Sequence, residues 1–492
     1  MILTASQANA QCGAPGVGGA GLAAALLSGG DERIAVDPMS GRNRYGLTAR
    51  PAPDEIFFSS STASAISPLG WAAAVTAWRR LACETAGERL ALPAWFDAIR
   101  RRIAAHAGGG EAILAASGTD AELLALALAA HIVKRPITNI VVGPGETGRG
   151  VALAAAGLHF QPSARRRRVA GWESLDVAVE TVEIRAPDGS PRPPGEVDAE
   201  VLAKAEAALA RGRGVIAHLL DVSKTGLAGF SRAAALALRA RAPERVVVLA
   251  DCCQMRGAAP LLRDLLDCGF LVSATGSKFF GGPPFSGALL VPDALHARLR
   301  DLRLPEGLAA HSALYDWPAP LRGAAAGFGS HANIGLGLRW EAALAEMDRF
   351  RAVPPGLAQA ITAGFRDLVE ADAREAGLTV LGEAGESMDW ARTIVPIAAR
   401  RADGLPLSPE QAEALQRALR RPAEARGYAA KVFHLGQAVA VGSDQALRVC
   451  LGAPMLSDIA QRCATGVRLD RALAPLAEDI AALFAKWRRL LR

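Results

Sequence analysis

The chain has 492 residues, of which 51% are hydrophobic and 21% charged, a composition typical of a globular protein and not of a disordered one. Its 50 glycines and 29 prolines follow no fixed period, which excludes a collagen-like chain. The formal net charge is only +6, and no aromatic residue interrupts the four arginines at 165–168. We therefore expect a solvated loop there rather than a nucleic-acid surface.

The cysteines and the apolar runs bear on the compartment. Seven cysteines, an odd number with no C-x-x-C pair, argue against a disulfide framework and against a cysteine zinc site, so we expect no metal centre. No apolar run approaches the ~20 residues needed to span a bilayer. No basic segment precedes the first apolar stretch, as a secretory signal requires. The sequence predicts a reduced, cytoplasmic protein that does not cross a membrane.

Residues 1–50 are rich in glycine and alanine. Gly16, Gly18 and Gly21 fit the dinucleotide-binding pattern G-x-G-x-x-G. That pattern has to follow a buried strand, and residues 4–12 are small and polar, so we interpret the match as a result of composition. From residue 70 to about 105, apolar residues recur at helical spacing.

Short apolar runs then alternate with helical segments. The sequence predicts strands at 112–116, 137–142, 215–220, 246–250, 270–274 and 288–291, and helices at 120–134, 231–241 and 259–267. This alternation favours an α/β fold, with a mostly parallel sheet covered by helices on both faces. Two long helices at 336–350 and 355–376 follow. Strands at 393–397, 439–441 and 446–451 and helices at 409–420, 459–463 and 473–490 predict a smaller C-terminal α/β domain.

We expect three parts in the chain. An N-terminal segment, 1–104, packs on both domains, the large domain covers 105–335, and the small C-terminal domain covers 336–492. Ligands of such sheets bind at the carboxyl ends of the strands, and four polar motifs stand at such positions.

The first motif is Ser117-Gly118-Thr119, between a predicted strand and a predicted helix. Glycine permits close approach of the backbone to a ligand, and the free N–H groups of a helix N-terminus bind phosphate. A plain N-cap by Ser117 is the alternative that the sequence leaves open.

The second motif is Asp251, which follows a buried apolar strand. A carboxylate there is costly unless it is paired, and a protonated pyridine nitrogen is a partner that needs a fixed negative charge. A metal ion is the competing partner, but neither a second carboxylate nor a histidine lies close by in the sequence.

The third motif is Lys278, which is one of only six lysines. It follows a predicted strand, and the adjacent Phe279 and Phe280 call for burial. Such surroundings favour the neutral amine that Schiff-base chemistry requires. The hydroxyls of Thr275 and Ser277 are candidate donors to an anion.

The fourth motif follows the strand at 215–220. His218 lies within that apolar run, where we interpret it as a core histidine. Ser223, which comes just after the run, is the better candidate for a hydrogen bond to a cofactor.

In this order the motifs resemble those of the fold type I pyridoxal-phosphate enzymes, most closely the class V aminotransferase and cysteine desulfurase group. The resemblance covers roughly residues 55–490. It rests on a phosphate loop, then a strand-end aspartate with glutamine three residues on, then Ser/Thr-x-x-Lys: Ser117-Gly118-Thr119, Asp251, Gln254, Thr275 and Lys278. Two later features are similar to the family as well. The segment Gly329-Ser330-His331-Ala332-Asn333 resembles one that reaches across a dimer to the cofactor phosphate, and Arg448 resembles the arginine that binds the substrate carboxylate.

The resemblance implies roles for these residues. Lys278 would hold pyridoxal 5'-phosphate through a Schiff base and then act as general base and acid. Asp251 would keep the pyridine nitrogen protonated, and Gln254 would bind the phenolic oxygen. Thr119, Thr275 and Ser330 of the partner subunit would hold the phosphate, so a homodimer with shared active sites is implied. Lys224 is the alternative anchor for the cofactor. It precedes Asp251 in the sequence, whereas in the family the aspartate precedes the anchoring lysine.

The sequence departs from the family pattern in two places. The family has a histidine that stacks on the cofactor ring, but residues 143–148 contain no aromatic side chain. A desulfurase needs a loop cysteine shortly before the carboxylate-binding arginine, and residues 423–446 contain none. Lys431, His434 and Gln437 stand there instead. We regard His434 as a residue of the substrate entrance, with a structural role as the alternative.

Three functions follow from these observations. The leading one is an aminotransferase that acts on an amino acid. The alternative is a pyridoxal-phosphate lyase or decarboxylase, including decarboxylation coupled to carbon–carbon bond formation. The third is a non-catalytic protein that has retained the fold.

Overall fold

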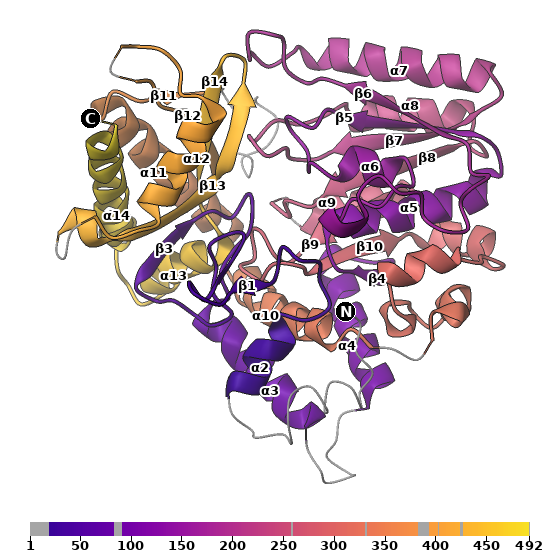
Figure 1. The fold of residues 1–492 in the computed structure, drawn as a ribbon, viewed down its shortest axis with the longest axis horizontal. Coiled ribbons are helices and arrows are strands. Elements are labelled where there is room, and N and C mark those ends of the chain that lie inside the picture. The colour runs from indigo at the N-terminus through magenta and orange to yellow at the C-terminus, as the bar shows by residue number, and fades with distance from the viewer. Residues whose placement is uncertain are drawn as a thin grey trace.

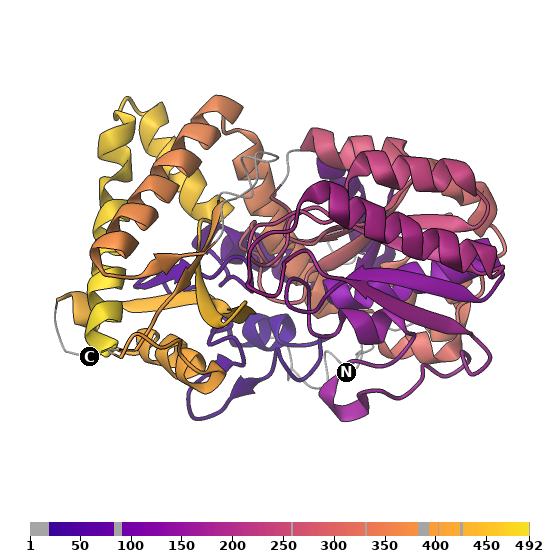
Figure 2. The same cartoon turned by 90° about the horizontal axis from the view of Figure 1, so that it is seen from above.

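Two β-sheets organise the protein in the computed structural model, which describes residues 19–82, 91–256, 259–329, 332–381, 393–401, 403–423 and 427–491. The seven-stranded sheet stands at the right of Figure 1 and the five-stranded sheet at the left. Figure 2 shows the same two parts from above. A short ribbon of β1 (Val36–Asp37) and β2 (Arg42–Asn43) belongs to the N-terminal segment.

The large sheet has the strand order β4-β10-β9-β8-β7-β5-β6. Its strands are β4 (Glu111–Ala115), β5 (Ile137–Val142), β6 (Val177–Val182), β7 (Gly214–Leu220), β8 (Val246–Cys252), β9 (Leu271–Thr275) and β10 (Gly287–Val291). Strand β10 is antiparallel to both of its neighbours, whereas the pairs from β6 to β9 are parallel. The predicted α/β fold with a mostly parallel sheet is confirmed.

Both faces of this sheet are buried. Successive side chains of a strand point to opposite faces, so Val215 and Ala217 of β7 enter one apolar cluster and Ile216 enters the other. Helix α5 (Gly118–Val133) packs in the second cluster. The first cluster contains residues of α4 (Leu92–Ala107), α7 (Pro194–Ala210), α8 (Arg232–Arg241) and α9 (Ala259–Asp267). A sheet buried on both faces explains the continuous apolar runs of its strands.

The small sheet has the order β11-β12-β14-β13-β3. Its strands are β11 (Thr379–Val380), β12 (Ile394–Ala398), β13 (Val432–Val441), β14 (Asp444–Cys450) and β3 (Glu55–Phe58). Helices α11 (Pro355–Glu375), α12 (Pro409–Leu419), α13 (Ala453–Ala464) and α14 (Leu469–Leu490) share one apolar core with it. Strand β3 pairs in parallel with β13, so the N-terminal segment supplies an edge strand that its composition did not predict.

The N-terminal segment also packs on the long helix α10 (Ile334–Arg351). Helix α3 (Pro68–Leu81) lies against α10, and the buried Arg339 guanidinium donates to the carbonyl oxygens of Leu26 and Ser28, at and after the end of α2 (Gly19–Leu26). Of the glycine pattern at 16–21, Gly21 lies within α2, and residues 16–18 fall outside the described residues.

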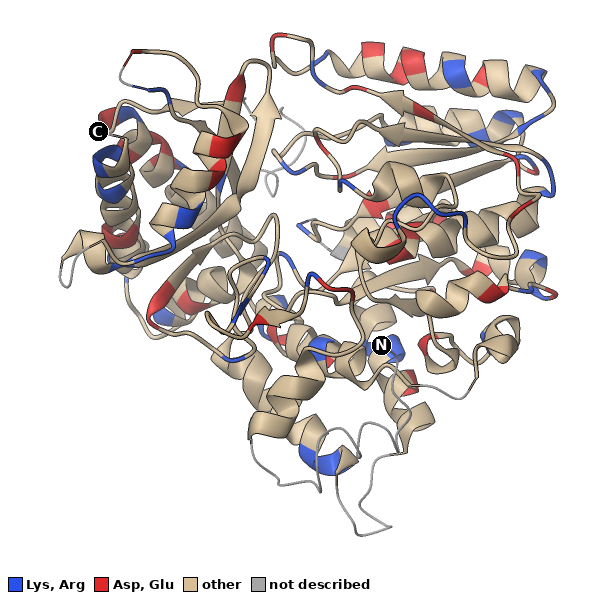
Figure 3. Cartoon of the chain, viewed as in Figure 1, with Lys and Arg blue, Asp and Glu red and all other residues tan. Residues whose placement is uncertain are grey.

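The distribution of charge and apolar residues bears on the expected partners. Acidic and basic residues are interspersed along α7 in Figure 3, and the arginines at 165–168 are exposed. Within the described part of the chain, none of the helices combines the length and apolarity that crossing a bilayer requires.

Candidate active site

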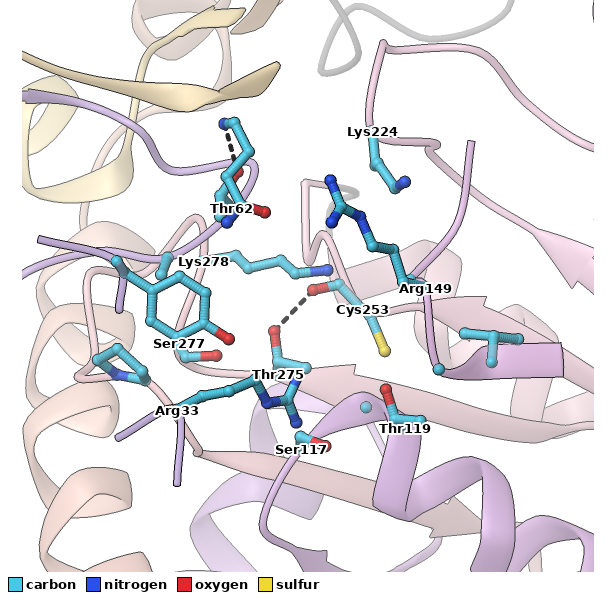
Figure 4. A pocket seen from close by; sticks show the side chains of 18 of the residues that line it. Arg33, Thr62, Ser117, Thr119, Arg149, Lys224, Cys253, Thr275, Ser277 and Lys278 are labelled. Carbon is cyan, nitrogen blue, oxygen red and sulfur yellow. Dashed lines mark hydrogen bonds between the residues drawn. The ribbon is translucent and has the colours of Figure 1, made fainter. Parts of the chain in front are cut away.

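A cavity of about 330 Å³ collects residues from both sheets and from the N-terminal segment. Eight of the predicted site residues line it: Ser117, Gly118, Thr119, Asp251, Thr275, Ser277, Lys278 and Arg448. Figure 4 shows the hydroxyl, thiol and basic groups that point into it. The sequence predicted a ligand at the carboxyl ends of the strands, and the cavity lies there, past the ends of β8 and β9.

The N-terminus of α5 forms one wall. Ser117 is its N-cap, and Ser117 Oγ accepts from Asp120 N (3.2 Å) and donates to Asp120 Oδ2 (2.6 Å). The N–H groups of Gly118 and Thr119 belong to the first turn, which has no intrahelical acceptors, and both residues line the cavity. The N-cap and the anion-site interpretations are therefore compatible. Capping uses the Ser117 side chain, and the N–H groups of Gly118 and Thr119 remain available to an anion.

The Lys278 amine extends into the cavity from the turn after β9 (Figure 4). Ser64 of the N-terminal segment holds the turn, since its Oγ donates to Lys278 O (2.7 Å) and its N–H donates to Ser277 O (3.1 Å). Among the described residues, no hydrogen bond or ion pair holds the Lys278 amine itself. The backbone is fixed, while the amine is available to a ligand.

Asp251 lies next to the end of β8. Its Oδ1 accepts from Cys253 N (3.0 Å) and from Ser273 Oγ (3.4 Å). A second carboxylate, Asp221, lies behind it with a buried, unpartnered Oδ2. Burial first, and then the charge of Asp251, raises the pKa of Asp221 to about 7. Of these two acids, Asp251 faces the cavity and Asp221 does not.

Arg448 of β14 closes the side opposite the large sheet. Its Nη2 donates to Thr62 Oγ1 (2.8 Å) and to Gln437 O (2.9 Å), and its Nη1 donates to Lys224 O (3.3 Å). Burial lowers the pKa of this guanidinium. No carboxylate among the described residues pairs with it. A buried guanidinium held only by neutral acceptors suits a carboxylate ligand.

Three predicted site residues do not line the cavity. The Ser223 hydroxyl is turned into its own loop, where it accepts from Thr225 N and Leu227 N (3.2 and 3.0 Å). The Gln254 side chain donates to Ser61 O (3.1 Å) and accepts from Arg256 Nε (3.4 Å). The structure therefore gives both residues a role in holding loops together and does not support a direct cofactor contact for either.

His434 is the third. Its Nε2 lies 2.7 Å from Glu55 Oε2, and its ring stacks on Phe57 at 4.4 Å. Burial lowers its pKa. These contacts join β13 to β3. They support a structural role for His434, which was the alternative to a role at the substrate entrance. His218 likewise pairs with a buried carboxylate, Glu122, at 3.1 Å. Ser330 and His331 lie outside the described residues.

Sequence reasoning missed several lining residues. Arg33, Tyr45 and Thr62 come from the N-terminal segment, and Arg149 comes from the loop before α6 (Val151–Ala155). Lys224, considered only as a substitute anchor, lies in the loop after β7 and donates from Nζ to Pro144 O (2.8 Å). An apolar run followed by a lone basic residue was the only available signal for Lys224, and Arg149 gave none.

The comparisons with known proteins give a clear fold. No protein-family model and no curated protein sequence matches the chain. Solved structures do match it. A NifS-like protein matches with 11% identity and a TM-score of 0.53, over 84% of this chain and 100% of its own. The cysteine desulfurase CsdA from Escherichia coli matches with 14% identity and a TM-score of 0.53, over 89% and 95%. The Oryza sativa TDC, solved with PLP and tryptamine, matches with 16% identity and a TM-score of 0.51, over 87% and 84%.

The chain has the fold of the fold type I pyridoxal-phosphate enzymes. That fold implies a cofactor, and the cavity residues fit it chemically. The free N–H groups at Gly118 and Thr119 suit a phosphate, Asp251 suits a pyridinium nitrogen, and the unpartnered Lys278 amine suits an aldehyde.

Gly118 makes the phosphate wall testable. A Cβ added there would lie 2.5 Å from Cys253 Sγ, which forces the helix N-terminus or the thiol to shift. We expect Gly118→Ala to weaken pyridoxal-phosphate binding about 10-fold, the effect of ~1.4 kcal/mol of overpacking. Fluorescence titration measures this. Because Cys253 Cβ is 3.5 Å away, the double variant Gly118→Ala/Cys253→Ala is expected to recover most of the affinity. An unchanged affinity in Gly118→Ala contradicts the phosphate assignment.

Proposed function

We propose that this protein is a pyridoxal-phosphate-dependent aminotransferase that acts on an amino acid. One observation carries the proposal. Lys278 and Arg448, an unpartnered amine and a buried guanidinium without a carboxylate partner, face the same cavity from opposite parts of the protein. An amino acid carries an α-amino group, which would lie on the Lys278 side, and an α-carboxylate, which would bind Arg448.

The residues divide the work. Pyridoxal phosphate, when bound, supplies an electron sink for the carbanion formed at Cα. The N-terminus of α5 would hold its phosphate, and Asp251 would keep a positive charge on its ring nitrogen. Arg448 orients the substrate through the α-carboxylate. Lys278 Nζ would take a proton from the substrate Cα and later return one.

Arg448 also favours aminotransfer over decarboxylation. A decarboxylase has to release the α-carboxylate, whereas an aminotransferase retains it throughout. A guanidinium fixed by Thr62 and Gln437 holds that group strongly in one orientation, which supports the reaction that keeps it. The decarboxylase or lyase alternative requires the carboxylate to lie outside this fork.

The described cysteines argue against desulfuration. Cys450 lies within β14 and donates to Ser61 Oγ (3.1 Å). Cys253 lines the cavity, but burial raises the pKa of its thiol well above the usual range, so it stays neutral. A nucleophilic cysteine has to reach the thiolate state.

The proposal includes a homodimer with shared active sites, with Ser330 of the partner subunit at the phosphate. This part of the proposal rests on the sequence resemblance of the segment 329–333, of which residues 330 and 331 lie outside the described part of the chain. Sedimentation of the purified protein tests the dimer independently of catalysis.

The decisive test is spectroscopic. We expect the purified protein, after addition of pyridoxal phosphate, to show the visible absorption of a cofactor–lysine adduct. Borohydride should fix the cofactor on the peptide that contains Lys278. Amino acids should then yield keto acids, with turnover sustained only when a keto-acid acceptor is present. Carbon dioxide release without an acceptor requirement indicates the decarboxylase, and a protein that remains colourless contradicts the proposal.

A further inference from the structure

The cavity carries more positive charge than the proposed cofactor and an α-carboxylate explain. Seven basic side chains line it, against two carboxylates, Glu122 and Asp251. Both carboxylates are engaged, Glu122 by His218 and Asp251 by Cys253 N and Ser273. Arg33 is neutralised by Asp31 at 2.7 Å, Arg448 serves the α-carboxylate, and Lys278 serves the cofactor. Four basic residues, Arg44, Arg149, Arg165 and Lys224, remain without an assigned anion, and among them Arg149 is the one whose charge acts on Lys224.

These two side chains lie together on one side of the cavity. Figure 4 shows the Arg149 side chain rising away from Thr119, toward Lys224 and the tip of Lys278. The charges of Arg448, Arg149 and Lys278 all act on Lys224. Arg149 has neither a hydrogen bond nor an ion pair among the described residues. The Arg149 guanidinium is therefore available to an anion.

Glu146, the carboxylate whose charge acts on Lys224, is already paired with Arg185. Glu146 lies two residues after Pro144, whose carbonyl oxygen accepts a hydrogen bond from Lys224 Nζ. Both Glu146 oxygens accept from Thr225 Oγ1 (2.8 and 2.7 Å), and Arg185 Nε pairs with Oε1. Glu146 thus fixes the loop and pairs with Arg185, and its effect on Lys224 is smaller than that of Arg448.

Burial, with the charge of Arg448 next in size, lowers the pKa of Lys224 to about 7. A cluster of like charges that is partly removed from water is unfavourable until an anion enters it. Its position is also specific, because Arg448 Nη1 donates to Lys224 O at 3.3 Å. A group held by Lys224 is therefore close to the carboxylate held by Arg448.

We propose that the substrate carries a second anionic group on a short side chain, and that Lys224 and Arg149 bind it. The chemical class is an amino acid with an acidic side chain, in which a carboxylate, a sulfonate or a phosphate supplies the charge. The inference rests on the proposed function for its α-amino and α-carboxylate groups. The second anion site itself depends only on residues of this chain.

Binding measurements test the site without turnover. Calorimetry on the full-length protein, with and without pyridoxal phosphate, should show succinate or glutarate binding more tightly than butyrate. Lys224→Gln and Arg149→Gln should each remove about 10- to 100-fold of that preference, the effect of losing a charge-assisted hydrogen bond. Lys204→Gln is the matched control, because Lys204 lies on α7 with Glu180 and Glu200 and outside the cavity.

The pH dependence gives a second signature. Bound anion favours the protonated amine, so the affinity for succinate should fall as the pH rises above 7, where free Lys224 loses its proton. The charged groups around it are Arg448, Arg149, Lys278 and Glu146. Lys224→Gln should flatten this dependence. An unchanged pH profile in the variant overturns the role of Lys224.

Activity then identifies the anion. The ratio of kcat/KM for glutamate over glutamine, or for aspartate over asparagine, should exceed 10, and this ratio should fall in Lys224→Gln. Comparison of O-phosphoserine with serine tests whether the second anion is a phosphate, and comparison of cysteate with serine tests whether it is a sulfonate. Equal binding of butyrate and succinate by the protein loaded with cofactor overturns the inference and leaves the aminotransferase proposal intact. Binding of dicarboxylates by a protein that never takes up pyridoxal phosphate overturns the proposed function and leaves the anion site intact.

Discussion

Lys278→Ala is expected to lower the turnover of amino acids by at least about 1,000-fold, because one side chain both anchors the cofactor and moves the proton. The visible absorption of the cofactor–lysine adduct should disappear from the purified variant. Folding should be little affected, since Ser64 and Gly281 bind the backbone of Lys278 and not its amine. Circular dichroism and thermal melting check that point.

Lys224→Ala is the matched control for the anchoring role. It removes the other lysine amine of the cavity, yet it should leave the adduct and its borohydride-fixed peptide in place. An adduct that survives in Lys278→Ala and is lost in Lys224→Ala contradicts the assignment of the anchor. A Lys278→Ala protein that keeps its full biological function supports instead a non-catalytic protein that has retained the fold.

The sequence was informative wherever the site depends on residues that are close together along the chain. Ser117 and Lys278 stand just after buried strands and Asp251 stands at the end of one, and the carboxyl ends of those strands meet at one edge of the sheet. Apolar runs of four to six residues were enough to place six strands of the large sheet, since burial on both faces leaves a continuous signal. The edge strand β6, which is only partly buried, was missed. The predicted fold and the cavity wall from the large sheet followed from that signal.

Side-chain direction was not available from the sequence. Gln254 and Ser223 stand at the expected spacing, yet each turns to satisfy a neighbouring backbone group. A buried polar side chain takes the hydrogen bonds that its own loop offers, and only the folded loop shows which these are.

Long-range contributions were missed for a different reason. Thr62 and Ser64 reach the site because β3 adds to the edge of the C-terminal sheet, almost four hundred residues away in sequence. A four-residue strand has no periodicity that distinguishes its partner. The sequence left the entrance role and the structural role of His434 open for the same reason, because its contact, Glu55, belongs to that strand.

The second large effect is expected at Asp251. Asp251→Asn should lower kcat about 100- to 1,000-fold, because the neutral amide removes the negative charge that stabilises a protonated ring nitrogen. The shape of the site should be preserved, since an asparagine oxygen can still accept from Cys253 N and Ser273 Oγ. Steady-state kinetics at saturating cofactor separate this loss from weaker binding.

A cofactor analogue methylated at the ring nitrogen distinguishes an electrostatic role from a structural one. The methyl group fixes the positive charge on the ring, so the analogue should restore part of the kcat lost in Asp251→Asn. Asp221→Asn is the matched control, because Asp221 is buried behind Asp251, does not line the cavity and already has its pKa raised to about 7. It should retain most of the turnover and need no analogue. Equal losses of kcat in the two variants, with no recovery by the analogue, would mean that Asp251 acts through packing. An acid that only supports the ends of the strands needs no charge that faces the cavity.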